Sequence, residues 1–310
     1  MDHHTPIESL PNELLIEILS PFPTCELLPL VGVSSHFSSI ILRILQRRLI
    51  RATSLPDHRL ILEWYHPSAK LSTPYLYCDY LYTDKTLYSE EEQEEHTGAP
   101  GGTQLGSLRQ AYSHFRPIVQ EENQRPRARY PPRVAQQQSQ SANDEESAGA
   151  SGPSSSSQWQ LETVPSLDIF LDEDEIFSQL CAVTNLVKTG PKPGLFLSHV
   201  NVSDGLIRVK RNWLAARAKH DLTSQDVNDD DEGILWADTA HTVGVRFRVR
   251  EKHTGIERPV LVAEGEEIPV AYQLEYEELL VRTSKLLMMV EKSEDQEIAT
   301  EGKAIVIASI

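Results

Sequence analysis

The sequence lacks the features that mark secreted, membrane-spanning and metal-clustered proteins. Its three cysteines, Cys25, Cys78 and Cys181, are odd in number and far apart, which fits neither a disulfide framework nor a zinc cluster. The first residues have no basic stretch followed by an apolar core, so we expect no signal peptide. No apolar run reaches the roughly 18 residues that cross a bilayer. We therefore expect a protein of the cytoplasm, the nucleus or both, with no membrane partner.

Positive charge is also scarce. The 310 residues carry 29 Lys and Arg against 46 Asp and Glu, which gives a net charge of −17. A general nucleic-acid binder needs a basic stripe that displaces counterions, so we expect no nucleic-acid partner. The ten lysines leave a long gap between Lys85 and Lys188, where composition alone would place about three.

Composition divides the chain into zones of different character. Residues 1–88 have a net charge of −2 and residues 161–310 a net charge of −11, and both contain periodic apolar residues. Residues 89–160 instead carry runs of Glu, Gln, Ser and Pro with few aliphatic side chains. Such a segment cannot bury enough apolar surface to offset its ordering entropy, so we expect a disordered linker with at most a transient helix near Leu108–Val119.

The carboxyl-terminal zone is mainly β in pattern. Apolar residues from Val243 to Val249 alternate with Arg246, Arg248 and Arg250, and a second alternation runs over 270–276. Asp204-Gly205 predicts a hairpin turn between two short strands. Helices are expected over 166–187 and 277–292, although the second segment could equally be a strand.

Three short helices are expected in residues 7–50. Pro11 suits a first helical position, and Ser34 or Ser35 suits the cap of the third helix, which should end near Arg47-Arg48. So short a module cannot bury all of its apolar faces by itself. These faces indicate either a docking surface or a contact with the later β domain.

The segment resembles an F-box, a helical domain found at the amino-terminal end of many proteins. The likeness covers about 44 residues and continues without a gap through Leu10-Pro11, Glu13-Leu14, Ile18-Leu19, Leu27, Leu30, Val33-Ser34 and Phe37. Phe37 stands where Trp is common in the family, and Pro29 lies in the second helix, where it costs a backbone hydrogen bond unless it is in the first turn. The layout also resembles F-box proteins of filamentous fungi.

The resemblance implies a non-catalytic substrate receptor of a cullin-RING (SCF) ubiquitin ligase. The F-box would dock on the Skp-type adaptor, a cullin would be recruited indirectly, and the carboxyl-terminal domain would hold a protein substrate. The adaptor-contacting residues carried over by the resemblance are Leu10, Pro11, Leu14, Ile18, Leu27, Leu30, Val33 and Phe37. No catalytic residue, metal or cofactor is expected.

The predicted fold class is multidomain α + β. It comprises an F-box at 7–52, an extension at 53–88 that packs with the carboxyl-terminal domain, the linker at 89–160, and a mainly-β, sandwich-like domain with one or two helices at 161–310. If the F-box is an independent module, deleting 1–52 should leave the β domain folded.

Three questions remain open at the level of sequence. The F-box could serve a scaffold that acts outside the ligase. The β domain could instead bind a carbohydrate or small ligand above a merely structural helical end, because the segment 209–214 (VKRNWL) faintly resembles a plant phloem-lectin domain. Arg246, Arg248 and Arg250 share one strand face, so they could contact an acidic or phosphorylated substrate or simply pair with nearby carboxylates.

Overall fold

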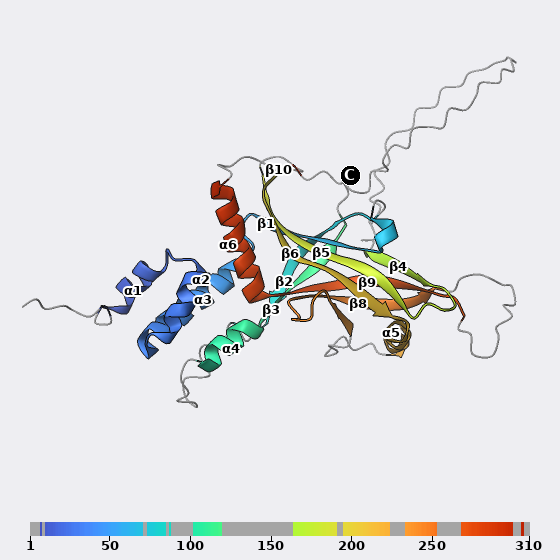
Figure 1. Ribbon diagram of the computed structural model, residues 1–310, viewed down its shortest axis with the longest axis horizontal. Helices are drawn as coiled ribbons and strands as arrows, with labels where there is room; N and C mark the ends of the chain where they lie inside the picture. Colours follow the sequence, from blue (N-terminus) through green and yellow to red (C-terminus); the bar gives the residue numbers. More distant parts are fainter. Residues whose placement is uncertain are drawn as a thin grey trace, which may run out of the picture.

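The computed structural model describes residues 7, 10–70, 73–84, 87, 102–119, 164–190, 195–223, 233–252, 268–299 and 305–306. These residues form a helical amino-terminal part and one large sheet that carries further helices (Figure 1). The predicted mixed α + β fold class, with an amino-terminal helical domain and a mainly-β domain, is confirmed. Within the described ranges, no helix is both long and apolar enough to cross a membrane.

The amino-terminal helices begin and end largely where the local signals predict. The hydroxyl of Ser34 accepts a hydrogen bond from the backbone N–H of Phe37 at 3.3 Å, so Ser34 is the cap of the third helix. Pro29 lies in the first turn of a 3-10 helix, where its missing N–H costs nothing. The elements are α1 (Asn12–Leu19), α2 (Thr24–Leu27), η2 (Leu28–Gly32) and α3 (Ser35–Thr53).

The helix α3 is longer than predicted, and its second half belongs to a different core. Its first half buries Phe37 and neighbouring isoleucines against α1 and α2, with Leu105 of α4 (Gly102–Gln110) packed alongside. Its second half buries Leu49 and Ala52 against Leu287 of α6 (Thr283–Ala299). The expected end at Arg47-Arg48 is therefore wrong, because this apolar face continues and finds partners outside the helical trio.

The sheet has ten strands among the described residues. Their order is β10-β6-β5-β1-β2-β3-β9-β8-β7, with β4 pairing β9 off this path and antiparallel pairing throughout. The bounds are β1 (His58–Tyr65), β2 (Leu76–Thr83), β3 (Tyr112–Ile118), β4 (Ser166–Leu171), β5 (Phe177–Thr189), β6 (Leu195–Lys210), β7 (Ile234–Trp236), β8 (Val243–Lys252), β9 (Val270–Arg282) and β10 (Ile305–Val306). Two further helices are η3 (Pro67–Ala69) and α5 (Arg211–Thr223).

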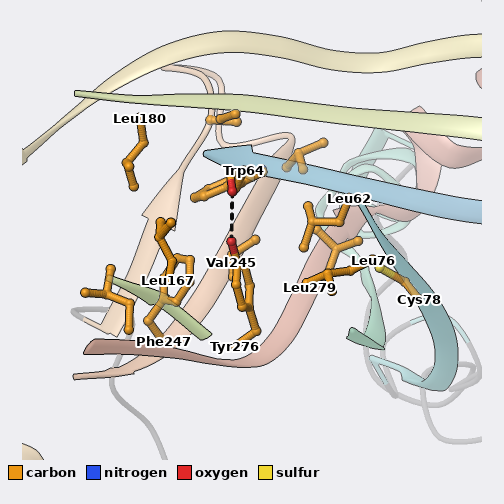
Figure 2. Close-up of a cluster of buried hydrophobic side chains, with 14 of the residues drawn as sticks. Leu62, Trp64, Leu76, Cys78, Leu167, Leu180, Val245, Phe247, Tyr276 and Leu279 are labelled. Atoms are coloured by element: carbon orange, nitrogen blue, oxygen red, sulfur yellow. Dashed lines mark hydrogen bonds between the residues drawn. The ribbon is translucent and has the colours of Figure 1, made fainter. Parts of the chain in front are cut away.

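The sheet curls around a single aromatic core. Trp64, Phe247 and Tyr276 lie at its centre, with ring centroids 5.7 Å apart for the first pair and 4.8 Å for the second (Figure 2). The hydroxyl of Tyr276 donates a hydrogen bond to the backbone carbonyl of Trp64 at 3.1 Å. This bond satisfies a buried carbonyl beyond the last residues of β1 that pair with β2.

The two sides of the curled sheet meet where β6 approaches the residue after β7. A Cβ atom built on Gly205 would lie 2.5 Å from the backbone oxygen of Ala237, so only glycine allows this approach. The result is one nearly barrel-like sheet rather than the two stacked sheets of the expected sandwich. The difference arises because β5 to β9 do not form a layer of their own but join β1, β2 and β3 in one path of paired strands.

The helix expected over 166–187 is instead the pair of strands β4 and β5. Burial alternates strictly along β4 and along the first part of β5, which is the period of a strand. The acidic residues Asp172–Glu175 lie in the connection between the two strands. The segment 277–292 divides at a single point, since β9 ends at Arg282 and α6 begins at Thr283.

The hairpin expected at Asp204-Gly205 is also wrong, because β6 runs through these residues without turning. The pairing register with β5 shifts between Thr184 and Asn185, so Val202 is an extra residue in the ladder. Glycine here serves the close approach to Ala237 rather than a turn. Asp204-Gly205 therefore marks an irregular position inside β6 and not the end of a strand.

The predicted linker contains a strand of the sheet. β3 lies within 89–160, yet it pairs with both β2 and β9. The helix expected near Leu108–Val119 therefore ends at Gln110, where α4 stops and β3 begins two residues later. Outside 102–119, the predicted linker lies beyond the described residues.

The strands β1 and β2, from the predicted extension 53–88, pair with β5 and β3.

Candidate docking surface

The first helix has one buried and one exposed apolar face. Leu15 and Leu19 are buried in the core that α1, α2 and α3 share. Leu14 and Ile18, one position earlier in each turn, are 45% and 46% exposed. A soluble helix normally turns such residues inward, so the outer row on α1 is a candidate contact surface.

The second part of the surface lies after α2. Val33 is 61% exposed and Leu28 is 42% exposed, whereas Leu27 and Phe37 are buried. Pro11 is exposed, and Leu10 and Leu30 are partly buried against the helical core. Of the eight predicted adaptor-contacting residues, Leu27 and Phe37 therefore support the surface from below instead of forming it.

The sequence interpretation missed Phe22. This residue lies in the turn between α1 and α2 and is 43% exposed. It stands between Pro21 and Pro23. A large aromatic side chain held between two prolines in a short turn is the signal that could have identified it.

The turn that carries Phe22 is tied to the rest of the protein by Arg48 of α3. Its guanidinium donates to the backbone carbonyls of Ser20 at 2.8 Å and Phe22 at 2.5 Å. It also pairs with Glu291 of α6 at 3.1 Å, and Glu291 in turn contacts Thr24. The turn between α1 and α2 is therefore bonded directly to α3, and α6 reaches it only through Arg48 and Thr24.

A pocket of about 330 Å³ opens beside this turn, between the helical trio and α6. Its apolar side is formed by Phe22, Leu287 and Val290, and charged side chains of Arg51, Glu294 and Asp295 complete the wall. The lining residues carry both signs of charge.

The arginines of β8 are all paired. Arg246 contacts Glu278 at 3.1 Å, Arg248 contacts Glu277 at 2.6 Å, and Arg250 contacts Glu275 at 3.2 Å. The charge pairing that the sequence left open is therefore present. In the pairs of Arg248 and Arg250, the arginine side chain is more exposed than its glutamate. Guanidinium groups therefore form the outer layer of this face. A contact with substrate at these arginines stays a prediction.

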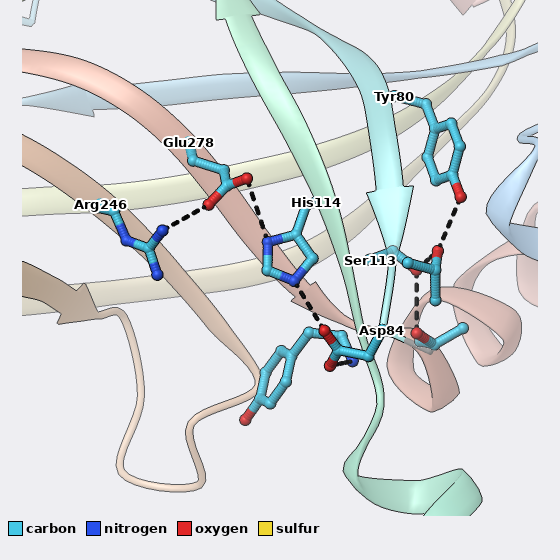
Figure 3. Close-up of polar contacts among 9 residues, drawn as sticks. Tyr80, Asp84, Ser113, His114, Arg246 and Glu278 are labelled. Atoms are coloured by element: carbon cyan, nitrogen blue, oxygen red, sulfur yellow. Dashed lines mark hydrogen bonds and ion pairs between the residues drawn. The ribbon is translucent and has the colours of Figure 1, made fainter. Parts of the chain in front are cut away.

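Arg246 belongs to a larger polar network centred on His114 (Figure 3). Nε2 of His114 is 3.2 Å from Asp84, and Nδ1 is 3.3 Å from Glu278. Burial alone would lower the pKa of His114, but its hydrogen bond with Asp84 and its charge interactions with Asp84 and Glu278 raise that pKa above its ordinary value. Burial likewise opposes ionisation of Asp84 and Glu278, and contact with His114 outweighs it and lowers both pKa values.

A buried serine–histidine chain lies where α6 covers the sheet. Nδ1 of His58 donates to the carbonyl of Pro56 at 2.6 Å, so Nε2 accepts from the hydroxyl of Ser293 at 2.9 Å. Ser293 also contacts Ser198, and both serines are fully buried. Burial, the leading cause, lowers the pKa of His58. With no access for a substrate, this chain joins α6 to the sheet and offers no nucleophile.

Two tryptophans of the β domain pack against neighbouring side chains. The segment 209–214 is the end of β6 and the start of α5, and Trp213 packs against the main core. Trp236 stacks on His241 with centroids 4.7 Å apart. Within the described residues, no group of three or more His, Cys, Asp or Glu side chains could hold a metal ion.

Comparison with known families identifies the domain formed by the three amino-terminal helices. The family model described as F-box domain matches residues 7–46, which cover α1, α2, η2 and the first part of α3. Neither the curated proteins nor the solved structures contain a match to the chain. The matched segment carries the exposed row of Leu14, Ile18 and Val33 on its own buried core. The chain is therefore an F-box domain protein.

Proposed function

We propose that this protein is the substrate receptor of an SCF ubiquitin ligase, docking on the Skp-type adaptor through its F-box. The proposal rests on one observation: the F-box has a buried apolar core of its own and a second set of apolar side chains exposed outside that core. Leu15, Leu19 and Leu27 form a closed core, while Leu14 and Val33 stay exposed outside it. An apolar row of this kind on a folded support favours a permanent protein partner.

The contribution of the protein would be proximity rather than chemistry. Ubiquitin transfer would be carried out by other subunits, and this chain would raise the effective concentration of a substrate lysine near them. Its buried serine–histidine chain contains no accessible nucleophile. We therefore propose a non-catalytic role.

The β domain is the proposed substrate-binding part. Arg246, Arg248 and Arg250 remain the candidate contact strip, because an ion pair leaves several of the five guanidinium N–H donors of each arginine for a second acceptor. An acidic or phosphorylated segment would suit these donors. We place this activity in the cytoplasm or nucleus, in keeping with three cysteines that are all free thiols.

Adaptor binding is tested with the double variant Leu14→Ala/Ile18→Ala. Both side chains are about half exposed, so the variant should fold normally but bind the purified Skp-type adaptor at least about tenfold more weakly. Leu206→Ala is the matched control, because Leu206 is 57% exposed on β6 in the β domain. Equal affinity for wild type and double variant would overturn the proposal.

Co-purification separates the receptor from the alternatives. Recovery of the cullin together with the adaptor supports a receptor within the ligase. Recovery of the adaptor alone supports a scaffold outside the ligase. If neither adaptor nor cullin is recovered, and the double variant behaves as wild type, the remaining hypothesis is a β domain that binds a carbohydrate or small ligand.

A further inference from the structure

The turn between α1 and α2 is held from within at Phe22, whose backbone N–H donates to the carbonyl of Leu19 at 3.2 Å. It contains Pro21 and Pro23, which have no N–H to donate, and it exposes Phe22. Its carbonyls at Ser20 and Phe22 accept hydrogen bonds from the guanidinium of Arg48. The position of Phe22 therefore depends on where that guanidinium is held.

Arg48 is held by an acid from the other end of the sequence. Nη1 of Arg48 donates to Oε1 of Glu291 and to Oγ1 of Thr24, both at 3.1 Å. Glu291 also accepts from the Thr24 hydroxyl at 2.6 Å and from the Thr24 backbone N–H at 3.1 Å. One carboxylate thus fixes both the arginine and the first residue of α2.

The cluster is sheltered enough for these bonds to matter. The side chains of Arg48 and Glu291 are 19% and 21% exposed, and charge-assisted hydrogen bonds strengthen as water is excluded. Thr24 itself is buried. Glu291 comes from α6, a helix that lies outside the segment matched by the F-box model.

We propose that Glu291 is a positioning residue for adaptor docking: the β domain supplies the acid that sets the docking turn of the F-box. This inference rests on the proposed function. Through Arg48 and Thr24, Glu291 keeps the turn in the conformation that leaves Phe22 exposed after the end of α1. The surface is then formed before the partner arrives, which removes an ordering cost from binding.

The expected loss of adaptor affinity follows from the fraction of molecules in which the turn is ordered. The apparent dissociation constant equals the intrinsic one divided by the fraction of molecules in the competent conformation. If loss of the acid leaves the turn ordered in about a tenth of the molecules, adaptor binding weakens about tenfold.

The test is the isosteric variant Glu291→Gln in the full-length protein, with Glu294→Gln as its matched control. The amide can replace one acceptor but not both, so the bonds to Thr24 and Arg48 cannot all form. Glu294 lies in the next turn of α6 and lines the same pocket, without a recorded hydrogen bond to the described F-box residues. Affinity for the purified adaptor and hydrogen exchange of residues 20–27 are measured for all three proteins.

The expected result has three parts. Glu291→Gln binds the adaptor about tenfold more weakly and exchanges faster over 20–27, with a thermal midpoint close to wild type, while Glu294→Gln behaves as wild type. Unchanged affinity for Glu291→Gln overturns the inference while leaving the proposed function intact, and so does an equal loss in both variants. If wild type itself binds no adaptor, the proposed function fails, and unchanged exchange over 20–27 then also excludes the ordering role.

Discussion

The imidazole of His114 and the carboxylate of Glu278 face each other from β3 and β9, with 3.3 Å between Nδ1 and Oε1. The contact is an ion pair in which the Nδ1–H is poorly aligned for a hydrogen bond. Tyr82 covers the imidazole, stacked with centroids 4.2 Å apart. A buried imidazole between two carboxylates, with its pKa raised by them, makes the stability of this sheet depend on pH.

The stabilising contribution of His114 should be lost as pH rises. Its pKa is raised on folding, so its contribution is full below about pH 6.5 and disappears as pH rises through the higher folded value. Chemical unfolding at pH 6 and pH 8 should show that the advantage of wild type over His114→Gln is larger at pH 6. Equal advantages at the two pH values would contradict the ion-pair assignment.

His58 provides a control of opposite sign. Its pKa is lowered by burial, so its contribution is present above about pH 6.5 and is lost as pH falls through the folded value. The advantage of wild type over His58→Gln should therefore grow between pH 5 and pH 7. The acids Asp84 and Glu278, with lowered pKa values, add a loss of stability below about pH 4.5.

Gly205→Ala should destabilise the protein by about 1–3 kcal/mol, because the new methyl group would press on the backbone oxygen of Ala237. Gly106→Ala is the matched control. It lies in α4 with open space around it, so alanine should stabilise that helix by about 0.5–1 kcal/mol. Urea unfolding measures both, and a neutral Gly205→Ala would mean that the two sides of the sheet do not meet here.

Tyr276→Phe should cost about 1–3 kcal/mol, because it leaves the buried carbonyl of Trp64 without its donor. Tyr80→Phe removes a hydroxyl from a side chain that is far more exposed, so it should change stability by less than about 0.5 kcal/mol. Thermal or urea unfolding of the two variants checks the difference. Similar losses in both would show that the bond to Trp64 contributes nothing special.

The F-box and the β domain should unfold together. Leu49 of α3 is buried with Leu287 and Ala111, so Leu49→Ala should lower stability by about 2–5 kcal/mol. The loss should appear equally in helical circular dichroism and in tryptophan fluorescence. For the same reason, deleting 1–52 should destabilise the β domain, contrary to the expectation for an independent module. Two separate transitions in wild type would contradict this view.

The lysine gap gives a prediction that depends on the proposed ligase role. Arginine keeps the positive charge of a segment without offering a ubiquitin-accepting amine. In a reconstituted ligase, replacing Arg125, Arg127 and Arg129 by lysine should increase self-ubiquitination. No increase would assign the gap to chance.

Local signals predicted the F-box helices well. The cap at Ser34 and the proline at residue 29 act within a few neighbours, so the printed sequence contains what decides them. Pro11 is one position off, because it is the N-cap of α1 and not its first helical residue. Leu14, Ile18 and Val33 were named as contacts only through the resemblance to an F-box, and the burial of Leu27 and Phe37 depends on how three helices meet. Phe22 was missed because the side chain that bonds its carbonyl is that of Arg48, which lies 26 residues away.

The sheet was harder to predict because its partners are distant. β3 pairs with β9 about 170 residues later, and only that pairing gives its apolar residues a core to enter. The composition around β3 suggested a linker, and no local signal could show otherwise. Asp204-Gly205 was read as a turn for the same reason, since its close neighbour Ala237 is 32 residues away.

The unbroken course of α3 bears on how this protein could be engineered. The F-box model ends at residue 46, but the helix continues to Thr53 and reaches the core beneath α6. A graft of residues 7–46 into another receptor would cut the helix in mid-course and leave Arg48 behind. An interchangeable version would have to bring α6 with it, so the portable unit is discontinuous in sequence.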